Sequence, residues 1–200
     1  MDVKSRSQEK VAYQTAARLH SDFITEGFLA TLGVPFLTLL YRSIDNDNDS
    51  VFLVEEVDGE IVGFVTGSSG LGRIYRALLL QPHRLLFALK ECFISPLKIY
   101  KIIEILVFSI KNRSLIQLPK EELLSIVVHG DYHGNGIAEK LFRSLCAQFA
   151  SKGAERFKIT VGGDLERAHA FYKKMGCTPF VELQVHAGVT SIVYIKELGA

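Results

Sequence analysis

The stretch that most constrains the fold runs over residues 122–138. Its first seven residues, ELLSIVV, are apolar and end in β-branched side chains, which predicts a strand, and the glycine-rich HGDYHGNG follows. From position 137 onward apolar residues recur at helical spacing: Ile137, Leu141, Leu145 and Phe149. A strand, a tight loop and a helix in this order place unpaired N–H groups and the positive end of a helix dipole at the loop, where a phosphate binds. The stretch therefore predicts a site for an anionic cofactor.

Two common phosphate-binding loops do not fit these residues. A P-loop requires a Gly-Lys pair five positions after its first glycine, and neither Gly130 nor Gly134 is followed by one. A dinucleotide fingerprint beginning at Gly134 and Gly136 would need its third glycine where Glu139 stands. Both loops are excluded by a required residue.

Two motifs instead resemble the GNAT acetyltransferase superfamily. Residues 133–138, His-Gly-Asn-Gly-Ile-Ala, are similar to its acetyl-CoA loop, Arg/Gln-x-x-Gly-x-Gly/Ala, with His133 in the position that is usually Arg or Gln. Residues 165–176, LERAHAFYKKMG, resemble the family segment Asn-x-x-Ala-x-x-Phe-Tyr-x-x-x-Gly-Phe, with Leu165 replacing the Asn and Cys177 replacing the final Phe. The two motifs occur in the family's order and spacing.

The resemblance implies an α/β fold, the GNAT acyl-CoA N-acyltransferase fold, with a central mixed sheet flanked by helices and one domain over residues 1–200. A chain of this length buries about 70% of its unfolded surface, which is enough for one core. The firmest local prediction is an antiparallel hairpin around Asp58-Gly59. Further strands are expected at residues 10–14, 156–161, 180–185 and 190–196, and helices from Thr15 and Pro35.

We expect a helical insert at about residues 71–118, between the third and fourth strands. Its apolar residues predict one amphipathic helix through residues 78–93 and another through residues 97–110, after Ser95-Pro96. Eight basic and two acidic residues between Arg73 and Arg113 give it a formal charge of +6, while the rest of the chain carries −5. Charges interrupt its apolar runs, which argues against a transmembrane span. Two interpretations stay open: a helical hairpin packed on the domain, or a basic amphipathic surface for a membrane or a phosphate-bearing substrate.

The resemblance also implies roles for individual residues. Backbone groups of the strand and loop are expected to bind the cofactor, with the N–H of Val128 polarising the thioester carbonyl: Ile126, Val127, Val128, His133, Gly134, Asn135, Gly136, Ile137 and Ala138. Tyr172 is the candidate general acid, with a core aromatic as the alternative. Glu122 is the candidate base, with Glu121, His129 or no dedicated base as alternatives. The segment between the first two helices is expected to contact the substrate, unless it only packs in the core: Glu26, Gly27, Phe28 and Leu29.

The predicted function is transfer of an acetyl group from acetyl-CoA to the primary amine of a small molecule. The basic insert favours an amino sugar or a nucleotide-linked amino sugar, and a non-catalytic acyl-CoA-binding module is the alternative. A net charge of +1 gives no indication of nucleic-acid binding. The acidic residues 45–56 match a calcium loop only partly, because Ser50 stands where that loop needs Gly, so no metal is expected. Residues 1–10 do not read as a secretory signal, which favours the cytoplasm; a monomer and a homodimer both stay open.

Overall fold

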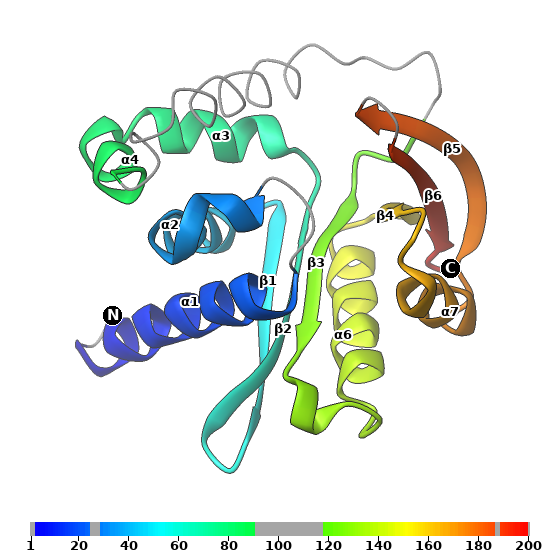
Figure 1. The fold of residues 1–200 in the computed structure, drawn as a ribbon, viewed down its shortest axis with the longest axis horizontal. Coiled ribbons are helices and arrows are strands. Elements are labelled where there is room, and N and C mark those ends of the chain that lie inside the picture. The colour runs from blue at the N-terminus through cyan, green and yellow to red at the C-terminus, as the bar shows by residue number, and fades with distance from the viewer. Residues whose placement is uncertain (1–2, 25–28, 91–117, 187–188, 200) are drawn as a thin grey trace.

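A computed structural model of the chain describes residues 3–24, 29–90, 118–186 and 189–199 (Figure 1). Helices and strands occur in this order: α1 Val3–Phe23, η1 Leu29–Leu32, α2 Gly33–Asp45, β1 Ser50–Val57, β2 Glu60–Ser68, α3 Leu71–Leu79, α4 Pro82–Ala88, β3 Glu122–Val128, η2 Gly130–Tyr132, α6 Ile137–Ser151, β4 Arg156–Gly162, α7 Glu166–Lys174, β5 Thr178–His186 and β6 Val189–Glu197. The α/β class predicted from the sequence is confirmed.

Six strands form one mixed sheet in the order β1-β2-β3-β4-β6-β5. Only β3 and β4 are parallel, and every other neighbouring pair is antiparallel. The hairpin predicted around Asp58-Gly59 is present as β1 and β2, and both turn residues have positive φ, 52° and 82°. That geometry suits the twist of a two-residue hairpin and requires Gly or a short polar residue.

Helices cover both faces of the sheet, and each face has its own hydrophobic core (Figure 1). On one face α1, α2 and α3 pack against Phe64 and Val127. On the other, α6 packs against Val65 and Val128. Gly67 permits the close approach of α6, because a Cβ there would lie 2.6 Å from a ring carbon of Phe149.

The short first strand predicted at residues 10–14 is wrong, because these residues lie inside α1. Tyr13, Ala16 and Ala17 are buried, whereas Val11 is 54% exposed. This i, i+3, i+4 pattern is helical and begins before Thr15. With that strand absent, the insert lies between β2 and β3, the second and third strands of the sheet.

The described part of the insert consists of α3 and α4, which confirms its helical character there. A single predicted helix is divided at Gln81, and Pro82 opens α4 at a position where its missing N–H costs nothing. Ile74, Tyr75 and Leu78 of α3 are buried in the same core as α2. The second predicted helix of the insert lies outside the described residues. No helix that the structure describes is long and apolar enough to cross a membrane.

Candidate active site

The site is built around a gap between β3 and β4. These two parallel strands are paired only at Glu122 and Leu123, where they face Lys158 and Ile159. The ladder between β3 and β2 shifts register at the same level, between Thr66 and Gly67. An extra residue in a strand bends it and increases its twist. The later part of β3 is therefore left with one edge unpaired.

The hydrogen-bond pattern of β3 shows which backbone groups face the gap. Gly63 and Val128 are opposite each other, and the N–H of His129 donates to the carbonyl oxygen of Val62 at 2.8 Å. In an antiparallel ladder this makes Val128 part of a non-hydrogen-bonded pair, so its N–H points away from β2. By the same alternation the N–H of Ile126 points away from β2, whereas that of Val127 points toward it. Ile126 and Val128 therefore present donors to the gap, and Val127 lies in the core.

The loop after β3 forms an anion cradle. Gly134 and Gly136 have φ values of 82° and 76°, and a Cβ added at either would meet nothing within 4 Å. Gly136 is the N-cap of α6, and no side chain caps that helix end. The first N–H groups of a helix have no intrahelical acceptor, so here they are open to an external anion. The loop fits the pyrophosphate of coenzyme A, while Ile137 is buried beneath it.

His133 holds the loop to the end of β3. Its Nε2 lies 2.8 Å from the carbonyl oxygen of Val128, so this nitrogen donates the hydrogen bond. Its Nδ1 then accepts from Nη2 of Arg167, at 3.4 Å. Arg167 comes from the first turn of α7 and brings a cation to the cradle. Arg167 is not among the site residues predicted from the sequence, although a basic residue inside the second motif was a signal for it.

Two clefts meet at this site. One, of about 350 Å³, lies along the loop, and the other, of about 600 Å³, lies along the gap between β3 and β4. Four residues line both clefts: Ile126, Arg167, Ala168 and Tyr172. Asn135 is exposed within the loop, and Gly134, Gly136, Ile137 and Ala138 line the smaller cleft. The structure thus brings the predicted cofactor residues together, apart from Val127.

Tyr172 stands where the two clefts join. Its ring packs against Phe171, Phe142 and Tyr194, and the residue is only 6% exposed. Burial raises the pKa of its phenol well above the ordinary value of 10. Among the described residues, its hydroxyl has no hydrogen-bond partner. The ring is therefore a core aromatic, while the side chain also lines the clefts as a protonated donor.

The other predicted catalytic and substrate residues are placed less directly. Glu122 accepts from Thr160 Oγ1 at 3.0 Å and pairs with Lys158 Nζ at 3.3 Å, and it lines neither of these two clefts. Residues 26–28 lie outside the described part of the chain, and Leu29 packs partly buried on the core. Phe23 and Ile24, at the end of α1, line the 600 Å³ cleft and were not selected from the sequence.

A buried polar chain reaches the 600 Å³ cleft from the α1 and α2 side. His20 Nδ1 lies 2.5 Å from the hydroxyl of Tyr41, and the nearby hydroxyl of Ser125 acts to lower the pKa of that phenol against the larger effect of burial. Burial lowers the pKa of His20 to about 4, so a neutral imidazole accepts the proton of Tyr41. Ser125 lines the cleft, so its hydroxyl can contact a ligand there. No spacing in the sequence indicates this group of residues, because its members are far apart along the chain.

Comparisons with known proteins agree with this geometry. The model of the acetyltransferase (GNAT) family matches residues 20–177. A comparison with curated proteins found no match. Solved structures with a similar fold include a protein from Desulfovibrio desulfuricans assigned to the GNAT family, with a TM-score of 0.57, 12% identity and 92% of both chains covered. An acetyltransferase has a TM-score of 0.58 at 18% identity, covering 94% of this chain and 96% of that chain.

A third similar structure is an aminoglycoside 6'-N-acetyltransferase complexed with coenzyme A, with a TM-score of 0.54 at 13% identity over 94% of this chain and 90% of that chain. Identities this low show a shared fold alone. The family model matches most of the chain, including both the loop at residues 133–138 and the segment at residues 165–176. The chain therefore belongs to the GNAT family of acetyltransferases and is a CoA-dependent N-acetyltransferase.

Proposed function

We propose that this enzyme acetylates the primary amine of a small molecule, with an amino sugar as the acceptor class. The observation that carries the proposal is the junction of the loop cleft with the gap between β3 and β4 at Tyr172. Acetyl-CoA held in the loop cleft and an amine held in the cleft along the gap would meet beside the phenol of Tyr172. The polar lining of the second cleft, which includes Ser125, Thr160, Asp164 and Glu166, suits an acceptor that carries hydroxyl groups and a positive charge.

Different groups of the protein would hold different parts of acetyl-CoA. Bound acetyl-CoA supplies an acetyl thioester. The cradle at residues 133–138 and the guanidinium of Arg167 would hold its phosphates, and the open edge of β3 at Ile126 would hold its amide-bearing arm as an added strand. The N–H of Val128 would donate to the thioester oxygen as that oxygen gains charge.

Proton transfers complete the reaction. A carbon–nitrogen bond forms to the amine and the carbon–sulfur bond breaks. The phenol of Tyr172 would give its proton to the departing sulfur and regain one from the nitrogen, which loses two protons in passing from ammonium to amide. Glu122 would take a proton from the attacking ammonium through water, since it lies away from the two clefts described above. Ser125 would accept a hydrogen bond from the same nitrogen and orient it.

Glu122→Gln tests the role of the base. We expect kcat/KM at pH 7 to fall about 100-fold, and the deficit to shrink at higher pH, where more of the amine is already deprotonated. Glu121→Gln, one residue earlier, is the matched control and should leave the pH profile unchanged. A Glu122→Gln enzyme with a normal profile would remove Glu122 from the mechanism.

The acceptor is tested by thiol release from acetyl-CoA with a panel of amines, alongside calorimetry with CoA. Free amino sugars and their nucleotide-linked forms should give turnover above polyamines, amino acids and peptides. The basic charge of the insert favoured the nucleotide-linked form. The structure weakens that support, because Arg73 of the insert is already paired with Asp47 at 3.2 Å and with Asp49 at 3.0 Å. Turnover confined to peptides would refute the proposed class, whereas failure to bind CoA would remove the donor site itself.

A further inference from the structure

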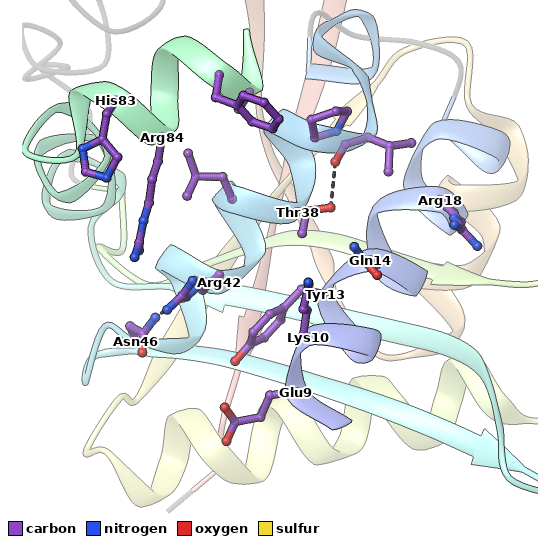
Figure 2. A pocket seen from close by; sticks show the side chains of 15 residues that line it. Glu9, Lys10, Tyr13, Gln14, Arg18, Thr38, Arg42, Asn46, His83 and Arg84 are labelled. Carbon is purple, nitrogen blue, oxygen red and sulfur yellow. Dashed lines mark hydrogen bonds between the residues drawn. The ribbon is translucent and has the colours of Figure 1, made fainter. Parts of the chain in front are cut away.

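A third cleft lies apart from the site of acetyl transfer. It is bounded by α1, α2 and α4 and has a volume of about 1190 Å³, which exceeds that of either cleft at β3 (Figure 2). None of its lining residues belongs to those two clefts. Along α1 it extends from Glu9 to Arg18, about 14 Å at the helical rise per residue. Nothing in the transfer chemistry uses these residues.

Basic side chains from three helices line this cleft. Lys10 and Arg18 come from α1, Arg42 from α2 and Arg84 from α4, and among the described lining residues Glu9 carries the one carboxylate. Figure 2 shows Arg84 extending from α4 toward Arg42. Four cations that share one carboxylate repel one another, and a bound anion reduces that repulsion.

Neither of the two facing arginines has a carboxylate partner in the part of the chain that the structure describes. Among the described residues, no carboxylate lies within ion-pair distance of Arg42, and Arg84 donates to the amide oxygen of Gln81 at 2.7 Å. The carboxylate of Asp45, on the same helix as Arg42, accepts from Tyr13 at 2.6 Å. Arg73 shows the contrast, because two aspartates pair with it. The chain therefore neutralises one arginine of the insert and leaves another directed into the cleft.

An apolar wall stands beside these cations. Val34 and Leu39 of α2 and Phe87 and Ala88 of α4 line the cleft, and Phe87 is 68% exposed. The ammonium of Lys90 lies over the Phe87 ring, 4.9 Å from its centroid, so this apolar side chain also stands next to a cation. The lining thus matches a ligand with an anionic end and an apolar body.

We propose that this cleft is a second binding site, for a phosphorylated amphiphile. Its phosphate lies between Arg42 and Arg84, and its apolar part lies against Phe87. A phosphate monoester fits better than a carboxylate, because its three terminal oxygens accept from guanidinium forks arriving from two helices. Both a free phosphorylated metabolite and phosphatidic acid, a membrane lipid whose headgroup is a phosphate monoester, have this chemistry.

Calorimetry of the full chain with octyl phosphate, in saturating CoA, tests the proposal. CoA then occupies the cradle at β3, so octyl phosphate cannot bind in the cradle and must bind elsewhere. Octyl phosphate should bind at least 10-fold more tightly than inorganic phosphate or octanol, which each carry one half of the recognised chemistry. Binding that disappears in CoA would assign the phosphate to the cradle and overturn the proposal.

Matched variants locate the contact. Arg42→Gln and Arg84→Gln should each weaken octyl phosphate binding about 10-fold or more, the usual effect of losing a charge-assisted hydrogen bond. Arg76→Gln removes the same charge from an exposed position of α3 outside the cleft and should change nothing. Phe87→Ser should weaken octyl phosphate and leave inorganic phosphate unaffected. Equal losses in all three arginine variants would show general attraction to a basic surface and would overturn the site.

Vesicles distinguish the two sources of the ligand. Co-sedimentation with phosphatidylcholine vesicles containing phosphatidic acid, but not with pure phosphatidylcholine, and its loss in Arg42→Gln would assign the cleft to a lipid headgroup. Binding of octyl phosphate without co-sedimentation would assign it to a soluble metabolite. Co-sedimentation that persists in Arg42→Gln, together with unchanged octyl phosphate affinity, would refute both.

Discussion

Replacing Tyr172 with Phe separates its packing role from its proposed acid role, because the change removes only the hydroxyl. Loss of a general acid typically lowers the rate 10²–10⁴-fold, or about 3–5 kcal/mol in activation free energy. The raised pKa keeps the phenol protonated between about pH 6 and pH 9, so Tyr172→Phe should lower the rate by the same factor throughout that range. Affinity for acetyl-CoA should stay unchanged, since the ring remains.

The structure also sets the effect of this change on stability. The hydroxyl of Tyr172 has no hydrogen-bond partner in the described part of the chain, so Phe leaves no group unsatisfied. The free energy of unfolding should stay within about 0.5 kcal/mol of the parent. Tyr194→Phe is the matched control: its buried hydroxyl donates to Nδ1 of His169 at 3.0 Å. It should cost about 1–2 kcal/mol of stability and leave the chemical step unchanged.

Single-turnover thiol release measures the chemical step apart from product release, and urea denaturation measures stability. The expected result is a slow, stable Tyr172→Phe enzyme and a fast, less stable Tyr194→Phe enzyme. A Tyr172→Phe enzyme with a normal single-turnover rate would assign Tyr172 to packing alone. Equal rate losses in both variants would attribute the effect to disturbed packing between the two rings.

Three further predictions follow from the same contacts. Gly136→Val should weaken CoA binding at least 10-fold by calorimetry, because φ is 76° there and the side chain would project into the cradle; an unchanged dissociation constant would move the donor site elsewhere. Gly67→Ala should lower the free energy of unfolding by about 1–3 kcal/mol through the clash with Phe149, while Gly72→Ala, which meets nothing within 4 Å, should not; equal denaturation midpoints would contradict the packing of α6. His20 has a folded pKa of about 4, below its unfolded value, so its neutral imidazole contributes fully to the free energy of unfolding above pH 6.5. About 3 kcal/mol of that free energy should be lost as the pH falls toward 4, and His20→Asn should flatten this pH dependence of stability.

Much of the fold follows from local patterns in the sequence. The hairpin at Asp58-Gly59, the strand before the cradle and the helix after it each carry their signal within a few residues. The strand predicted at residues 10–14 is wrong because a short apolar segment is compatible with the spacing of either a strand or a helix. The longer helical pattern through Tyr13 and Ala17 shows that these residues belong to α1. Local patterns also could not place Glu122, since the residues that bind it, Lys158 and Thr160, lie on another strand.

Long-range contacts explain what the sequence could not show. Ser125, Tyr41 and His20 come from a strand and two helices, and no spacing in the chain relates them. His20 and Tyr41 are buried and hydrogen-bond each other, whereas the Oγ1 of Thr66, which faces Ser125 in the ladder, is buried without a partner in the described part of the chain. A buried hydroxyl without a partner costs about 1–3 kcal/mol. The Thr66 hydroxyl therefore lowers stability next to Ser125, a residue that lines the 600 Å³ cleft.

The histidine at position 133 departs from the family motif, in which this position is usually Arg or Gln. A side chain of either kind would bring hydrogen-bond donors to the loop. Here His133 donates to the carbonyl oxygen of Val128, which holds the loop against the end of β3. Arg167 brings a cation from α7, and its guanidinium donates to the other nitrogen of the same histidine. Residues of both motifs therefore meet at one loop, and under the proposed function Arg167 would supply the phosphate contact that the side chain of His133 does not make.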